Sequence, residues 1–140
     1  MKISKEYRWE MGHRLPDHDG LCRNIHGHSY RMIVELDGEV ASNGMIIDFY
    51  DLGKIVKPVI EKLDHCFLVH KDDEKVLIFL RENGMKYEVT DYFATVENIA
   101  LNICKILAEG IKARKFNNVK SVSVKIFETP NSSAEVKIDL

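Results

Sequence analysis

The sequence predicts an α+β domain in which an antiparallel sheet carries its helices on one face. Four stretches, two near the N-terminus and two at the C-terminus, alternate apolar and polar residues, which is the period of half-buried strands. Two long stretches between these pairs have the spacing of amphipathic helices. The order is β-β-α-(α/β insert)-α-β-β, and this order favours an antiparallel four-stranded sheet covered on one side.

The N-terminal half supplies the first two strands and the first helix. Residues 3–13 place Tyr7, Trp9, Met11 and His13 on one side of a strand, and residues 26–38 alternate in the same way. The loop between them is rich in Pro, Gly and Asp. Residues 48–65 have helical spacing, with Asp48 or Asp51 as the N-cap and a kink expected at Pro58.

The C-terminal half repeats the pattern in reverse. Residues 72–84 predict a short helix closed by Gly84, and residues 86–93 a short strand. Residues 95–116 predict the longest helix, with Thr95 as its N-cap. Residues 119–128 and 133–140 alternate strongly and predict the last two strands.

The chain-wide properties predict one cytoplasmic domain. The chain has 140 residues, 45% hydrophobic and 30% charged, and we expect a single domain over residues 1–140. Its net charge of −2 argues against nucleic-acid binding. We find neither an apolar run of roughly 20 residues, which would predict a membrane span, nor a secretory signal. Three widely spaced cysteines fit a reducing compartment.

A candidate metal site begins at the short motif "HGH". On a strand, His26 and His28 project to the same side, and catalytic zinc commonly has three protein ligands at about 2.0–2.1 Å from nitrogen. His13 is the leading candidate for the third ligand, because a hairpin-like pairing brings the end of the first strand close. Two solvated histidines on a surface strand are an equally simple interpretation of the motif.

Cys22 lies in the polar loop four residues before His26. A lone cysteine is often an inert, small hydrophobic residue. A nearby Zn²⁺ favours the thiolate, which acts as a base or nucleophile or becomes a further metal ligand. The spacing alone leaves all of these roles open.

Further polar residues stand at the ends of the predicted elements. Asp64 and His65 are adjacent at a helix end, either as charged caps or as an oriented proton-transfer pair. Glu128 continues the alternating positions of Val122, Val124 and Ile126, which are expected to face the core, and this is an unusual place for a carboxylate. It is either an exposed turn acid or an anchor for a ligand with several N–H donors. Thr95 and Glu97 are explained as an N-cap and a first-turn acid.

Together, four blocks resemble one protein family: "MGHRLPDHDGLCRNIHGHSYRMIVELDG", "GMIIDFYDLGKIVKPVIEKLDH", "TVENIA" and "FETPNSSAE". They are similar to blocks of the 6-pyruvoyltetrahydropterin synthase family, and most of all to its 6-carboxytetrahydropterin synthases of the queuosine pathway. The resemblance covers nearly the whole chain except an insertion around residues 69–94. This chain also departs from the family pattern at Val69, where Asn is frequent, and at Ala94, where Pro is usual.

The resemblance implies the tunnelling fold (T-fold), in which subunits pool their strands into an oligomeric barrel, commonly a hexamer of two trimers. It implies zinc as the cofactor, held by His13, His26 and His28. It also implies a pterin substrate and a set of catalytic and substrate-binding residues. The catalytic residues are Cys22 as base and Asp64 with His65 as a proton relay, often from a neighbouring subunit, and the pterin-binding residues are Glu128, Thr95 and Glu97.

The implied reaction converts 7,8-dihydroneopterin triphosphate to 6-carboxy-5,6,7,8-tetrahydropterin, with release of acetaldehyde and triphosphate. Only Arg23, Asn24 and Ile25 separate Cys22 from His26, and in the resembled family this short interval is typical of the carboxy-forming enzymes. The alternatives are a 6-pyruvoyltetrahydropterin synthase and a non-catalytic relative that binds zinc or pterin. Arg14 and Arg23 flank the histidines and are candidates for contacting the triphosphate.

Overall fold

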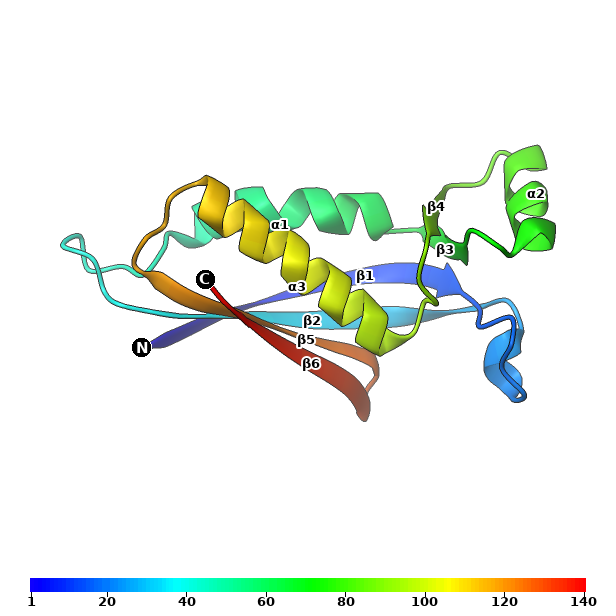
Figure 1. The fold of residues 1–140 in the computed structure, drawn as a ribbon, viewed down its shortest axis with the longest axis horizontal. Coiled ribbons are helices and arrows are strands. Elements are labelled where there is room, and N and C mark those ends of the chain that lie inside the picture. The colour runs from blue at the N-terminus through cyan, green and yellow to red at the C-terminus, as the bar shows by residue number, and fades with distance from the viewer.

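The protein folds into one six-stranded mixed sheet with three α-helices. Figure 1 shows the computed structural model, which describes residues 1–140. The strands are β1 Lys2–His13, β2 His26–Gly38, β3 Cys66–His70, β4 Tyr87–Thr90, β5 Val119–Thr129 and β6 Ser132–Asp139. The helices are α1 Phe49–Leu63, α2 Glu74–Glu82 and α3 Val96–Ala113, with a 3₁₀ turn at Leu21–Arg23.

The strand order is β4-β3-β1-β2-β5-β6. The four strands at β1, β2, β5 and β6 pair antiparallel, as the alternation predicts. The prediction of a four-stranded, wholly antiparallel sheet is nevertheless wrong, because β3 and β4 extend the sheet in parallel. The short strand expected within residues 86–93 is β4. The sequence stretch "CFLVH" of β3 is a short apolar run with no alternation, so its period does not identify it as a strand.

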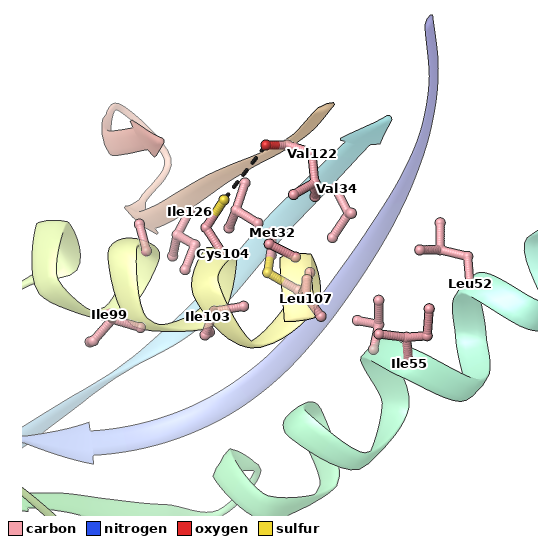
Figure 2. Packing of buried hydrophobic residues seen from close by; sticks show 14 of the residues in the cluster. Met32, Val34, Leu52, Ile55, Ile99, Ile103, Cys104, Leu107, Val122 and Ile126 are labelled. Atoms are coloured by element: carbon pink, nitrogen blue, oxygen red, sulfur yellow. Dashed lines mark hydrogen bonds between the residues drawn. The ribbon is translucent and has the colours of Figure 1, made fainter. Parts of the chain in front are cut away.

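Helices α1 and α3 cover one face of the sheet (Figure 1). Alternate side chains of the central strands point towards these helices and are fully buried, and they meet the apolar face of α3 (Figure 2). Each such aliphatic side chain contributes about 1.5–3 kcal/mol by leaving water. The residues at this interface include Met32, Val34, Val122, Val124, Ile126, Ile99, Ile103, Cys104 and Leu107.

The helix ends follow the local sequence signals. The Asp48 carboxylate accepts a hydrogen bond from the Tyr50 N–H at 2.7 Å and caps α1. The Thr95 hydroxyl accepts from the Asn98 N–H at 3.3 Å and caps α3. After α2 the chain turns at Gly84, whose φ of 61° is one that glycine adopts without strain. None of the three helices has the length and apolar character needed to cross a membrane.

The end of β1 and the start of β2 lie side by side, next to the N-terminal end of α3. The first residues of β2 belong to the same register as the buried Tyr30 and Met32. Polar side chains at the end of β1 and the start of β2 therefore face the helical side of the sheet, at the edge of the apolar core. This end also carries β3, β4 and α2 (Figure 1).

Candidate metal centre and substrate cleft

Three histidines converge at this end of the sheet. His13 is the last residue of β1 and pairs in register with His26, the first residue of β2. His28 follows two residues later and projects to the same face. One nitrogen from each ring lies within 4.8 Å of the others, so the three histidines expected from the spacing do form a cluster suited to a metal ion.

Backbone carbonyls fix the orientation of two of the rings. The Nδ1 atom of His13 lies 2.7 Å from the Ala94 carbonyl oxygen, and that of His26 lies 2.7 Å from the Asn24 carbonyl oxygen. A carbonyl can only accept, so each Nδ1 carries the proton and each Nε2 presents a lone pair. This is the arrangement by which outer partners orient metal-binding histidines.

The donor set fits a cation. His13 is 2% exposed, and its Nε2 has no hydrogen-bond partner, although buried polar atoms are normally satisfied. The Glu128 Oε1 atom lies 3.4 Å from Nε2 of His13 and 3.6 Å from Nε2 of His28. The lone pair on His13 Nε2 and the Glu128 carboxylate, which face each other without a proton between them, repel each other. A positive ion among them removes the repulsion.

Burial keeps the ligands in the form that binds metal. It lowers the pKa of His13 and that of His28, and the nearby Glu128 carboxylate opposes this effect only in part. A lowered pKa means that both rings are neutral at pH 7. Metal ions bind neutral imidazole, so no proton has to be displaced from these two side chains.

A cleft of about 570 Å³ opens beside the triad. It collects five of the side chains that the sequence singled out, from four separate parts of the chain: His13, Cys22, Thr95, Glu97 and Glu128. The turn after β5 and the start of β6 add further polar lining residues that the sequence did not single out, Asn131, Ser132 and Ser133.

Cys22 stands on the 3₁₀ turn Leu21–Arg23 and is half-buried. The turn is held in place by the Leu15 N–H, which donates to the Cys22 carbonyl at 2.8 Å. The thiol is therefore carried on a short, fixed turn beside the three histidines. The other two cysteines, Cys66 and Cys104, are buried.

Tyr30 also belongs to this site, although no motif in the sequence singled it out. Its ring is buried and stacks on Trp9 with a centroid distance of 5.2 Å. Its hydroxyl donates to Glu128 Oε1 at 3.4 Å. Burial and the Glu128 charge both raise the pKa of Tyr30, so the phenol stays protonated and remains a donor to the carboxylate. The only signal in the sequence was that Tyr30 shares a strand face with His28.

Asp64 and His65 do not line this cleft within the chain. They form a pair of their own, with 3.0 Å between Asp64 Oδ1 and His65 Nδ1, and His65 lines a separate cleft of about 560 Å³ with Glu10 and Lys86. The pKa of Asp64 is lowered chiefly because its carboxylate accepts a hydrogen bond from the Glu10 N–H, and to a smaller extent by its contact with His65.

The backbone at His65 has a left-handed φ of 55°, which non-glycine residues rarely adopt. Its side chain is 77% exposed. Strained conformations of this kind are concentrated at functional sites.

Comparisons with known proteins agree along the whole chain. The family model described as 6-pyruvoyl tetrahydropterin synthase matches residues 2–139. A Haemophilus influenzae protein named 6-carboxy-5,6,7,8-tetrahydropterin synthase is 36% identical, covering 96% of this chain and 96% of that protein. An Aquifex aeolicus protein of the same name is 29% identical, covering 97% of each. A catalytic-residue variant of Plasmodium vivax 6-pyruvoyltetrahydropterin synthase has the same fold, with a TM-score of 0.81 at 20% identity over 100% of this chain and 98% of that one.

Proposed function

Because the chain belongs to the 6-pyruvoyl tetrahydropterin synthase family, we propose that it is a zinc-dependent lyase of the 6-carboxytetrahydropterin synthase type. Its substrates are 7,8-dihydroneopterin triphosphate and one water molecule, and its products are 6-carboxy-5,6,7,8-tetrahydropterin, acetaldehyde and triphosphate. The reaction belongs to queuosine biosynthesis.

The observation that carries the proposal is one cleft that combines a metal ligand, a thiol and a carboxylate, in His13, Cys22 and Glu128. A non-catalytic binding protein has no need of a thiol beside its metal. The chain also matches a relative named 6-carboxy-5,6,7,8-tetrahydropterin synthase at 36% identity over nearly its full length.

His13, His26 and His28 would hold the zinc ion. Three neutral imidazoles leave a zinc ion with an open position for substrate. When bound, zinc acts as a Lewis acid that lowers the pKa of substrate hydroxyl groups and helps to hold the side chain of the pterin in register.

Glu128 and the residues at the start of α3 hold the pterin ring. The Glu128 carboxylate accepts hydrogen bonds from a ring N–H and the exocyclic amino group, and each such charge-assisted bond contributes about 1.5–3 kcal/mol. Tyr30 orients the carboxylate through its 3.4 Å hydrogen bond. Thr95 and Glu97 complete the same wall of the cleft.

Cys22 acts as the base that removes a proton from the substrate side chain. Three residues separate it from His26, and His26 Nδ1 donates a hydrogen bond to the carbonyl of one of them, Asn24. The tether is therefore compact and holds the thiolate over the carbons nearest the ring. This position favours cleavage of the side chain, and hence the carboxy product rather than a retained three-carbon pyruvoyl group.

Asp64 and His65 supply the second proton transfer from a neighbouring subunit. Within the chain, His65 is exposed and contacts Asp64 alone among acidic groups, which suits a relay presented to another copy. The sheet ends at β6 and β4, whose free edges are available for pairing. We propose a homo-oligomer of trimeric symmetry, a hexamer of two trimers, in which such pairing closes a barrel.

The test is mass spectrometry of products formed from 7,8-dihydroneopterin triphosphate by the zinc-loaded protein, with acetaldehyde trapped as a hydrazone. We expect 6-carboxytetrahydropterin and trapped acetaldehyde in equal amounts. A three-carbon pyruvoyl side chain on the pterin, without acetaldehyde, would instead assign the protein to the pyruvoyl branch. The absence of any product from fully zinc-loaded protein would refute both branches.

A further inference from the structure

The Arg14 guanidinium is held by Asp73, which lies 59 positions further along the chain. Its Nε lies 2.6 Å from Oδ2 of Asp73, and its Nη2 lies 2.6 Å from Oδ1. The Asp73 side chain is 4% exposed and the Arg14 side chain 25% exposed. A bidentate pair that is shielded from water fixes both distance and orientation, unlike an exposed ion pair.

Asp73 occupies the N-cap position of α2, where an aspartate commonly accepts a hydrogen bond from the first turn. The Asp73 side chain makes no such bond. Both of its carboxylate oxygens are used by Arg14. The carboxylate therefore joins α2 to the end of β1 instead of capping its own helix.

Backbone contacts complete a closed ring around this pair. His13 pairs with Leu68 in the parallel register of β1 and β3. At the end of β3, the His70 carbonyl accepts a hydrogen bond from the Asp73 N–H at 2.9 Å. The ion pair between Asp73 and Arg14 closes this loop of contacts, because Arg14 directly follows His13.

The segment that connects β3 to α3 carries Asp73 near its start, and its last residues contact His13 itself. The Ala94 carbonyl accepts from His13 Nδ1 at 2.7 Å. The ring of Phe93, the residue before Ala94, stacks on the ring of His70 with a centroid distance of 4.5 Å and an angle of 14°. The segment from β3 to α3 thus grips both the side chain of His13 and the residue next to it.

We propose that Arg14 is a positioning residue for the metal ligand His13, and that it acts by clamping the end of β1 to the α2 segment. The inference rests on the metal site of the proposed function. Arg14 is not one of the three clustered histidines that would bind the metal. It holds the chain so that the Ala94 carbonyl stays aligned with His13 Nδ1, and so that Nε2 faces the other two histidines.

The consequence is a metal affinity that depends on a residue outside the ligand set. Partners that orient a ligating histidine contribute roughly 10- to 100-fold to metal affinity. Without the pair, the end of β1 and the loop before α3 are free to move relative to each other. The three nitrogens then spend less time in the geometry that binds metal.

The experiment measures zinc affinity by competition with a chromophoric chelator, using the intact metal-free protein, and records the visible spectrum of the Co²⁺-loaded protein. We expect Arg14→Gln to weaken zinc binding roughly 10- to 100-fold and to change the Co²⁺ spectrum. Arg14→Lys should recover part of the affinity, because lysine keeps the charge but loses the bidentate fork. The matched control is Lys120→Gln, which breaks the exposed Lys120–Glu39 pair at the opposite end of β2 and should leave affinity within about twofold.

An Arg14→Gln protein with wild-type zinc affinity and an unchanged Co²⁺ spectrum, but a lower melting temperature, would show that the pair only stabilises the fold and would overturn the proposal. If Arg14→Gln does not fold, Asp73→Asn and Arg14→Lys decide by the same criterion. A wild-type protein that binds no zinc would refute the metal site itself. If the wild type binds zinc and the Arg14→Gln protein binds it equally well, the metal site stands and only the role of Arg14 is refuted.

Discussion

Replacing Cys22 by alanine tests the assignment of the catalytic base. General-base catalysis by a positioned side chain contributes about 10²- to 10⁴-fold to a rate, and we expect Cys22→Ala to lower kcat by at least the smaller factor. The assay is the formation of 6-carboxytetrahydropterin by zinc-loaded protein. Zinc content and pterin affinity should stay close to wild type, because the proposed site holds the metal with three histidines and the ring with Glu128.

The structure predicts that this substitution leaves the fold intact. Cys22 is half-buried on a surface turn, and its thiol makes no hydrogen bond. The Leu15–Cys22 bond that holds the turn uses backbone atoms, which alanine retains. We therefore expect the free energy of unfolding to change by no more than about 0.5 kcal/mol. A loss of activity then reports on chemistry and not on unfolding.

Cys66→Ala is the matched control. Cys66 is 2% exposed, and burial raises the pKa of its thiol to about 11, so it is a protonated core residue at neutral pH. Its replacement should lower stability by about 1 kcal/mol and leave kcat nearly unchanged. If Cys22→Ala keeps more than a hundredth of the wild-type rate, the thiol is not the base. If it loses its zinc, the thiol is a ligand.

Three further predictions follow from the same site. His26→Ala should lose most of its zinc by elemental analysis, against about one ion per subunit in the wild type, and full retention would contradict the triad. Iodoacetamide at pH 8 should alkylate Cys22 and spare Cys66, because the pKa of Cys66 is near 11 and its thiol is buried; peptide mapping that finds Cys66 modified as fast as Cys22 would count against the structure. Light scattering should give a trimer or hexamer at micromolar concentration, and a stable monomer would rule out an active site shared between subunits.

The elements with a strong period could be predicted from the sequence, and those without one could not. The long strands at β1, β2, β5 and β6 bury alternate residues on a single face, so their period of two is visible. Asp48 and Thr95 cap their helices as their positions predicted. Strand β3 has only five residues, four of them apolar, and it pairs with β1, 55 residues away, as well as with the short strand β4. Such a pairing leaves no local signal.

The candidate site divides in the same way. His13, His26 and His28 are predictable, because one strand pairing and one i, i+2 spacing bring them together. Glu128 is predictable as a carboxylate that continues a buried register. Tyr30 and Ala94 contribute through contacts with residues 98 and 81 positions away. No spacing rule foresees such contacts, because they depend on how the strands and loops pack.

The departure from the family pattern at Ala94 bears on whether the metal site is intact. Ala94 is buried, and its hydrogen bond with the triad is made by its carbonyl oxygen, which accepts from His13 Nδ1. Proline, the residue usual there in the resembled family, has the same carbonyl and lacks only the N–H. The exchange therefore removes backbone rigidity and no hydrogen bond to His13. The Arg14–Asp73 pair fastens the N-terminal part of the segment that ends at Ala94, so both ends of that segment remain attached to the end of β1.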